Sequence, residues 1–427
     1  MATAYLVYRP WVSRVPILLP ALGLAALMAW FQAISWSPLH PTWLRIPAAV
    51  VLIGVSAGVL IGLNAMGLVS PEPLAAGLAV AILAAYPVAM AGVAGARRGD
   101  HWRAWPARLK PWRAASRSGR RPFRSAFEAQ FWFEWRCHGL VLPVAVAGIL
   151  LVVLPLGFLR HGILAGFVLI GLCMPVVIAS ATGAAVARLA PFWAWRRRVM
   201  PIAMTRPMTS GGMVAAKFGM AAASVLMAWA LTLLALTLLI VVGGGGEDVA
   251  DYWAAWRGRY PGWKAVAVVT LGAVSGLALT WRQLTDFAPY ALTGRAWVEN
   301  IAAIPMVAVI VVGTAAGLWL PFHPEDRVHI LAAFPWLVAS LSILKVLVTS
   351  WAFRQATRRG LIGARALSGI LALWLVLVAS AVGLAAFTLP AWLAAEMRVA
   401  VMVGIATFVP LARFALAPLA LDWNRHG

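Results

Sequence analysis

Charged residues are scarce in this sequence, and carboxylates are the scarcest of them. Only 11% of the 427 residues are charged, with 35 Lys and Arg against 13 Asp and Glu, whereas soluble domains carry about 25% charged residues. Hydrophobic residues make up 63% of the chain, which is more apolar surface than a water-soluble fold hides. This composition excludes an ordinary soluble domain and predicts an integral membrane protein.

Cysteines and catalytic motifs are also lacking. The two cysteines, Cys137 and Cys173, form no CxxC pair, so neither a disulfide framework nor a zinc site is expected. The sequence contains no GxxxxGK[ST] nucleotide-binding loop and no HExxH motif, and no nucleophile and base stand out as a pair. We therefore expect no enzyme, no catalytic residue, no bound metal and no cofactor, and any ATP hydrolysis has to come from a partner chain.

Apolar runs long enough to cross a membrane occur along the whole chain. A helix of ~20 residues crosses the hydrocarbon core, and the alternation of a membrane β-barrel is absent. The predicted fold class is all-α, a polytopic integral membrane protein with about 11 transmembrane helices. The expected spans cover residues 15–36, 47–69, 73–95, 138–159, 162–187, 213–243, 262–280, 299–320, 329–350, 366–389 and 399–418.

Basic residues gather in one segment, residues 97–137, which holds eleven of the 35 Lys and Arg. Because Lys and Arg favour cytoplasmic loops, we expect this segment inside. Alternation of the spans then places 27 of the 35 basic residues inside, with the amino terminus outside and the carboxyl terminus inside. An acidic loop around residues 247–251 falls outside. This placement accounts for the net charge of +22, so nucleic acid is not an expected partner.

An amphipathic helix is predicted just before the fourth span. Ser125 and Glu128 have the spacing of a capping box, and the aromatic residues after them share one helical face. Either this helix lies flat in the membrane interface, with its aromatics toward the lipids and its charges toward water, or it extends the fourth span into the cytoplasm. The residues of this predicted interface helix are Ser125, Phe127, Glu128, Phe131, Trp132, Glu134 and Trp135.

A second cytoplasmic element connects the fifth and sixth spans. Pro207 interrupts helix, and Thr209 or Ser210 can cap the helix that follows. The pattern predicts a rigid elbow over residues 203–212 that a partner protein grips, and the alternative is a plain basic loop. Its central residues are Thr205, Arg206, Pro207, Met208 and Thr209.

The predicted spans contain almost no carboxylates, since all thirteen are expected in loops or at span edges. Lys217 and Lys345 are expected about one turn from cytoplasmic ends, where they can snorkel to water. This argues against an ion-coupled carrier, which needs buried ionisable relays. A membrane enzyme acting on a lipid-linked substrate stays an alternative, with Asp286, Arg282 and Arg295 of one inside loop as its candidate polar groups.

Two stretches of the sequence, residues 29–44 and 280–298, echo each other. Both leave a span as Trp-x-Gln, and both enter the next span at a Trp. If the echo reflects a duplication, the chain consists of two related halves, and the opening part of the first half is missing from it.

Several of these stretches resemble bacterial ABC transporter permeases of the type-2, exporter-like kind, in their duplicated form. The resemblance covers most of the chain. It is carried by residues 127–136, by Thr205–Thr209 followed by Ala215-Ala216-Lys217, and by the loop holding Trp281, Arg282, Gln283 and Arg295.

The resemblance implies a transmembrane subunit that moves an amphipathic or lipid-like solute across the bacterial cytoplasmic (inner) membrane. A separate ABC ATPase would dock on the elbow, next to the interface helix that contacts membrane lipids. A second permease chain or a second copy of this one stays open as a further partner. The expected parts are a three-span remnant of a first permease half at 1–96, a basic linker with the interface helix at 97–137, a six-span second half at 138–350, and two extra spans at 351–427.

Overall fold

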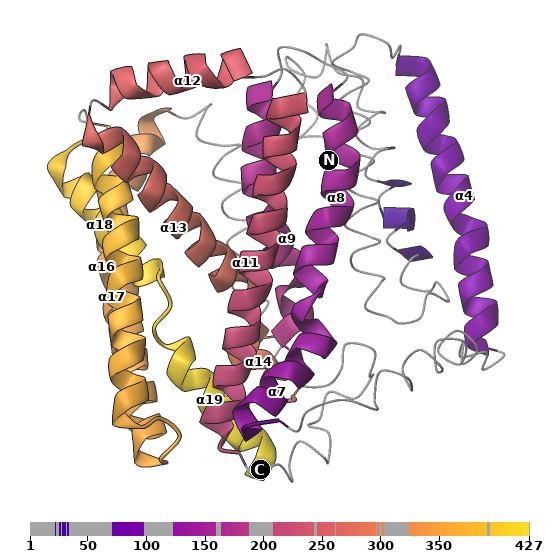
Figure 1. Ribbon diagram of the computed structural model, residues 1–427. Helices are drawn as coiled ribbons and strands as arrows, with labels where there is room; N and C mark the ends of the chain where they lie inside the picture. The colour runs from indigo at the N-terminus through magenta and orange to yellow at the C-terminus, as the bar shows by residue number, and fades with distance from the viewer. Residues whose placement is uncertain are drawn as a thin grey trace. The chain divides into compact units, whose positions relative to one another are not determined.

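A computed structural model of the chain describes residues 71–97, 123–158, 164–187, 208–242, 246–260, 262–295, 324–390 and 393–426, with a few residues between 22 and 33 and between 297 and 302. Every regular element among these residues is a helix, which confirms the predicted all-α fold. In chain order they are α4 (Pro71–Arg97), α7 (Ala126–Glu134), a π-helical turn (Trp135–Gly139), α8 (Val141–Phe158), α9 (Leu164–Ala187), α11 (Ser210–Val242), α12 (Gly246–Arg259), α13 (Trp263–Thr285), α14 (Ala288–Ala291), α16 (Pro324–Arg358), α17 (Ala364–Thr388), α18 (Ala395–Phe408) and α19 (Arg413–His426) (Figure 1).

Six helices of the described residues are long and apolar enough to cross a membrane, so the chain is a multi-pass membrane protein. The expected count of about 11 spans is not confirmed. Residues 47–69, residues 299–320 and most of 15–36 lie outside the described part, and the expected spans 73–95 and 162–187 contribute only the shorter apolar helices Ala76–Ala91 and Gly171–Ala184. The six helices are Ala126–Leu151, Ser210–Val242, Trp263–Ala291, Ala332–Arg358, Ala364–Thr388 and Ala395–Arg425.

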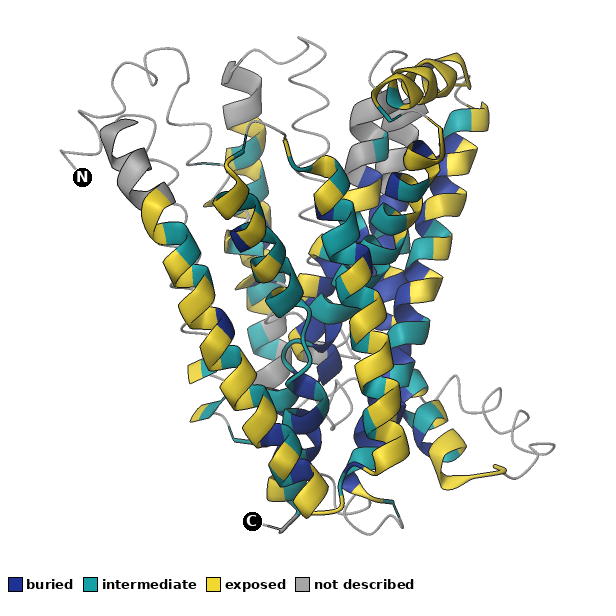
Figure 2. Cartoon of the chain, turned by 90° about the vertical axis from the view of Figure 1, so that its left-hand side faces the viewer, coloured by how far each residue is buried: buried dark blue, intermediate teal, exposed yellow. Residues whose placement is uncertain are grey.

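The long helices have exposed residues on their outer faces (Figure 2), and many of these residues are large and apolar. On α16, for example, Trp336, Leu341 and Leu347 are each more than half exposed. In water a contiguous apolar surface of this kind drives association. A helix satisfies its own backbone hydrogen bonds, so the same surface is stable against lipid tails.

The chain divides into two compact units. Unit 1 comprises residues 1–122 and 147–163, and unit 2 comprises residues 123–146 and 164–427. Within unit 1, the Trp30 indole N–H donates to the carbonyl oxygen of Ala81 on α4 at 3.0 Å. Unit 2 contains most of the described helices and every charged cluster discussed below.

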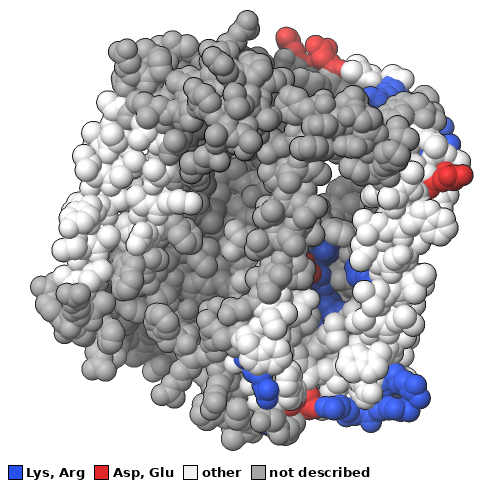
Figure 3. Space-filling view, turned by 180° about the vertical axis from the view of Figure 1, so that it is seen from behind, with Lys and Arg blue, Asp and Glu red and all other residues white. Residues whose placement is uncertain are grey.

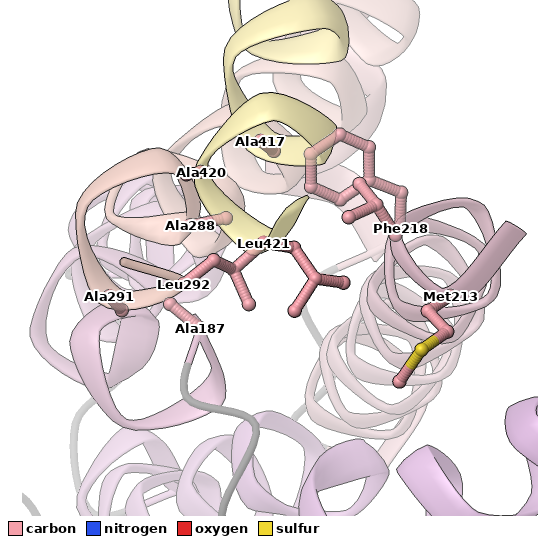
Figure 4. Packing of buried hydrophobic residues seen from close by; sticks show 10 residues of the cluster. Ala187, Met213, Phe218, Ala288, Ala291, Leu292, Ala417, Ala420 and Leu421 are labelled. Atoms are coloured by element: carbon pink, nitrogen blue, oxygen red, sulfur yellow. The ribbon is translucent and has the colours of Figure 1, made fainter. Parts of the chain in front are cut away.

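The core of unit 2 lies where α9, α11, α14 and α19 meet (Figure 4). Met213 and Phe218 of α11 pack there with Leu292 and Leu421. Lipid removes the hydrophobic drive between helices, so close van der Waals packing between small residues holds such contacts together. The small residues of this cluster are Ala187, Ala288, Ala291, Ala417 and Ala420.

The helix of the seventh expected span, residues 262–280, is longer than expected. α13 continues to Thr285, so Trp281, Arg282 and Gln283 lie on its last turns and not in a loop. The Thr285 hydroxyl donates to the Trp281 carbonyl oxygen at 2.9 Å inside this helix. The expected boundary was wrong because hydropathy shows only where the side chains become polar. The helical backbone hydrogen bonds of α13 continue beyond that residue.

Two further features differ from the expected loops and spans. The loop after α11, which we expect outside, contains α12, and this helix lies across the ends of α11 and α13 (Figure 1). The expected span 399–418 is interrupted, since α18 ends at Phe408 and α19 begins at Arg413. Pro410, which has no backbone N–H to donate, lies in this break.

Candidate functional site

A buried ion pair joins α7 to α11. Lys217 Nζ donates to Glu134 Oε2 at 2.9 Å and to the Val186 carbonyl oxygen at 3.0 Å. Glu134 is 0% exposed and Lys217 is 2% exposed. Gln130 Nε2 donates to the other carboxylate oxygen at 2.9 Å, and His138 Nδ1 lies 3.3 Å from Glu134 Oε2. The two opposite charges therefore neutralise each other where water has no access.

The sequence of α7 explains why this polar stripe is buried. Gln130, Glu134 and His138 recur at every fourth residue, so they share one helix face, and that face packs on α11. The helix is fixed at its start by Ser125, whose Oγ accepts the backbone N–H of Glu128 at 3.1 Å. The predicted cap is therefore confirmed.

The aromatic residues of α7 and of the turn after it are partly exposed and partly packed beside α11, where a Cβ on Gly219 would lie 3.8 Å from the Phe131 ring. Phe127 and Trp132 are exposed, and the rings of Phe131 and Trp135 stack with centroids 6.4 Å apart. These residues, apart from Phe127, help to line a pocket of about 360 Å³ next to α11. The exposed aromatic residues and the cap at Ser125 fit both a helix in the membrane interface and an extension of the fourth span.

One expectation for α7 is wrong, because Glu134 does not face water. Its carboxylate turns inward to Lys217, as the fully buried side chain shows. α7 also continues through the π-helical turn Trp135–Gly139 into α8. Single π-helical turns within α-helices are frequent at functional sites.

The expected snorkelling of two lysines is also wrong. Lys217 is buried against Glu134. Lys345 is the middle residue of the span Ala332–Arg358, roughly 20 Å from either end by the rise of a helix. The expected span ends at residue 350, which puts Lys345 close to water, whereas α16 continues to Arg358.

A second charged cluster forms where α13, α16 and α19 approach each other. Arg413, the first residue of α19, donates through Nη2 to Asp286 Oδ1 at 2.5 Å and through Nη1 to the Arg282 carbonyl oxygen at 2.8 Å. Arg282 Nη2 lies 3.6 Å from Asp286 Oδ2. Lys345 lies within electrostatic reach of all three. Figure 3 shows basic and acidic atoms of this kind in the middle of one face, apart from the charges at the two ends.

The break between α18 and α19 lies beside this cluster. Lys345 Nζ donates to the carbonyl oxygen of Thr407, and the Trp374 indole N–H donates to that of Val409 at 3.3 Å. Irregular backbone at membrane depth is tolerated where protein groups satisfy it or where it lines a cavity. Broken helices of this kind form the binding sites of many transporters.

A third group of contacts ties the elbow to the carboxyl-terminal helix. Arg425 Nη1 donates to the Met208 carbonyl oxygen at 2.9 Å, and Asn424 Nδ2 donates to that of Leu292 at 3.0 Å. The Thr209 hydroxyl accepts a backbone N–H of the first turn of α11 at 3.1 Å, so the predicted cap by Thr209 is confirmed. Thr205, Arg206 and Pro207 lie outside the described residues.

Trp281 and Arg295, which were expected in one loop, also contact α11 and α19. The Trp281 indole N–H donates to the Phe218 carbonyl oxygen at 3.2 Å, and both rings contact that of Phe414. The Arg295 guanidinium lies 4.0 Å from the centre of the Trp423 ring. On α11, Lys217 therefore contacts α7 and the next residue, Phe218, contacts α13. α11 thus connects the predicted interface helix to the end of α13.

Sequence reasoning missed several of these residues. Gln130 and His138 had a usable signal, because their spacing from Glu134 places three polar groups on one helix face. Arg413 and Arg425 had none, because their partners lie on α13 and at the start of α11. Gln283 has a backbone role, since its carbonyl oxygen would lie 2.6 Å from any Cβ placed on Gly183 of α9.

Comparisons with protein-family models, curated proteins and solved structures find no match for this chain. Among the described residues, no three His, Cys, Asp or Glu side chains gather in a way that could hold a metal ion. Fold and site together define a multi-pass α-helical membrane protein with one buried ion pair and one partly exposed charged cluster among its helices.

Proposed function

We propose that the chain is the transmembrane subunit of an ATP-driven transporter for an amphipathic or lipid-like solute, energised by a separate ABC ATPase. One observation carries the proposal. The end of the elbow, the predicted interface helix and the pair Trp281 and Arg295 are far apart in sequence, and all three contact α11 or α19 within unit 2.

The contacts of α11 suggest how an ATPase would act on the spans. A partner that presses on the elbow displaces the start of α11, which is tied to α7 through Lys217 and to α13 through Phe218. Arg425 ties the same start to α19. A single push is therefore distributed to four helices, which is the coupling that alternating access requires.

The membrane and the orientation belong to the same proposal. Under the proposal the basic segment 97–137 and the elbow lie in the cytoplasm, where ATP is available and where basic loops are favoured, and the chain lies in the cytoplasmic membrane of a bacterium. The ATPase is the required partner, and a second permease chain or a second copy of this chain would complete the pathway.

The test is co-purification of the full chain with an ABC ATPase from the same genome. We expect a complex whose ATPase activity rises in the presence of the chain. Arg206→Glu, which reverses a charge in the elbow, should lower the amount of bound ATPase by at least about tenfold. Arg257→Glu on α12, at the other end of unit 2 (Figure 1), is the matched control and should leave it unchanged. Absence of a complex, or equal loss in both variants, would reject the proposal.

One observation favours a second candidate, an ion-coupled carrier. Glu134 and His138 are buried titratable groups in one membrane helix, and such groups commonly mark proton pathways. The full chain reconstituted without an ATPase distinguishes the two functions. Solute uptake driven by a pH gradient and lost in Glu134→Gln would favour the carrier, and uptake that requires ATP and the ATPase would favour the permease.

A further inference from the structure

The cluster around Asp286 has an excess of positive charge. Arg282, Lys345 and Arg413 gather around this single carboxylate, and within the described residues no other carboxylate forms an ion pair with any of them. All of them lie inside helices long and apolar enough to span a membrane. Unbalanced charge at that depth is costly, so a counter-charge is needed from outside this cluster.

The donors of the cluster are not all used by the protein. Arg282 Nε is buried and has no hydrogen-bond partner within the described part of the chain. Lys345 donates to the Thr407 carbonyl oxygen and has no carboxylate of its own there. The Arg282 guanidinium lies 3.5 Å from the centre of the Phe408 ring, which holds it in place without neutralising it.

The cluster is also reachable from outside. The Asp286 side chain is 39% exposed and that of Arg282 is 15% exposed. On α16, Leu341 and Val348 lie one turn before and one turn after Lys345, and both are exposed. A molecule bound at Lys345 would therefore meet a charged group beside an apolar helix face.

We propose that Arg282 and Lys345, beside an Arg413 that Asp286 and Thr285 hold in place, bind the oxyanion headgroup, a phosphate or a group of similar charge, of an amphipathic molecule whose hydrocarbon chain lies along α16. Planar guanidinium groups bind oxygen anions through paired hydrogen bonds, and an ammonium group adds a compact charge. The broken backbone between α18 and α19 gives the headgroup a place at membrane depth. As the solute of the proposed transporter, this molecule rests on the proposed function, but its binding does not require transport.

The test measures binding to the full chain in a neutral maltoside detergent, without ATP or an ATPase. Dodecyl phosphate and inorganic phosphate are titrated separately, and bound ligand is followed by native mass spectrometry and by ³¹P NMR. We expect dodecyl phosphate to bind well above inorganic phosphate. Lys345→Met should weaken binding at least about tenfold, because it removes one charged hydrogen bond, and Lys345→Arg should retain it.

Lys264→Met is the matched control, because Lys264 is exposed near the start of α13. It should leave binding unchanged, and the elution profile of each variant shows whether it is folded. Equal affinity for inorganic phosphate would overturn the assignment to an amphiphile. Absence of dodecyl phosphate binding, or the same loss in Lys264→Met as in Lys345→Met, would overturn the site. Either result leaves the co-purification test of the ATPase partner standing.

Discussion

At the scale of single residues, the pair Glu134–Lys217 shows how a membrane helix tolerates charge. Each ion alone would be buried without water, and the pair with its hydrogen bonds from Gln130 and to Val186 satisfies both. Such pairs add little net stability compared with apolar residues, but removal of one partner leaves an uncompensated charge. The pair therefore determines the position in which α7 packs on α11.

Lys217→Met tests this reading directly. We expect it to lower the free energy of unfolding by about 3–5 kcal/mol, because Glu134 stays buried without its ammonium partner. The double variant Glu134→Gln with Lys217→Met should recover most of this loss, since no charge is left buried. Unfolding by heat in a neutral detergent gives the comparison.

Lys264→Met serves as the control again, with little expected change at an exposed site. A double variant as unstable as Lys217→Met would show that the pair is held by packing and not by charge.

At the residue level, the sequence was sufficient to predict the helix caps but not the residues that pair over long distances in the chain. Ser125 and Thr209 were predicted because a cap depends on the few residues that follow it. Arg413 and Asp286 are 127 residues apart in the chain, and nothing in either local sequence indicates the other. The excess charge of that cluster therefore became visible only with the tertiary structure.

At the scale of elements, the contact between α9 and α13 depends on a glycine. A Cβ on Gly183 would lie 2.6 Å from the Gln283 carbonyl oxygen, so any side chain there has to push the two helices apart. Small residues at such crossings allow the backbone-to-backbone approach that stabilises membrane helices.

Gly183→Leu should therefore destabilise the chain by about 1–3 kcal/mol through overpacking. Gly272→Leu, on α13 itself, is the matched control, because a Cβ there meets nothing within 4 Å. Both are compared by thermal unfolding in the same detergent. A loss in Gly272→Leu equal to that in Gly183→Leu would mean that the helix interior, and not the crossing, is sensitive to substitution.

The existence of the long helices followed from hydropathy, whereas their ends and breaks did not. α11 and α17 begin and end within a few residues of the expected spans. α12 was missed because its acidic and basic side chains read as a loop. The break at residues 409–412 was missed because apolar composition continues across it, although Pro410 was a usable signal.

At the scale of the whole molecule, unit 2 has two different ends. α12 lies at one end, and α7 and the carboxyl-terminal turns of α19 lie at the other (Figure 1). Every contact that ties the predicted docking elements together lies on the α7 and α19 side. The proposed ATPase partner requires this side to face the cytoplasm.

The orientation is tested by thiol labelling of intact cells. In a chain carrying Cys137→Ala and Cys173→Ala, a single cysteine is introduced either as Arg113→Cys in the basic segment or as Glu247→Cys at the start of α12. Because basic loops stay inside, we expect a membrane-impermeant maleimide to label Glu247→Cys in intact cells. Arg113→Cys should be labelled only after the membrane is permeabilised. The reverse pattern would place the elbow outside the cell, where no ATPase could reach it, and the permease proposal would fall while the buried ion pairs and their stability predictions would be unaffected.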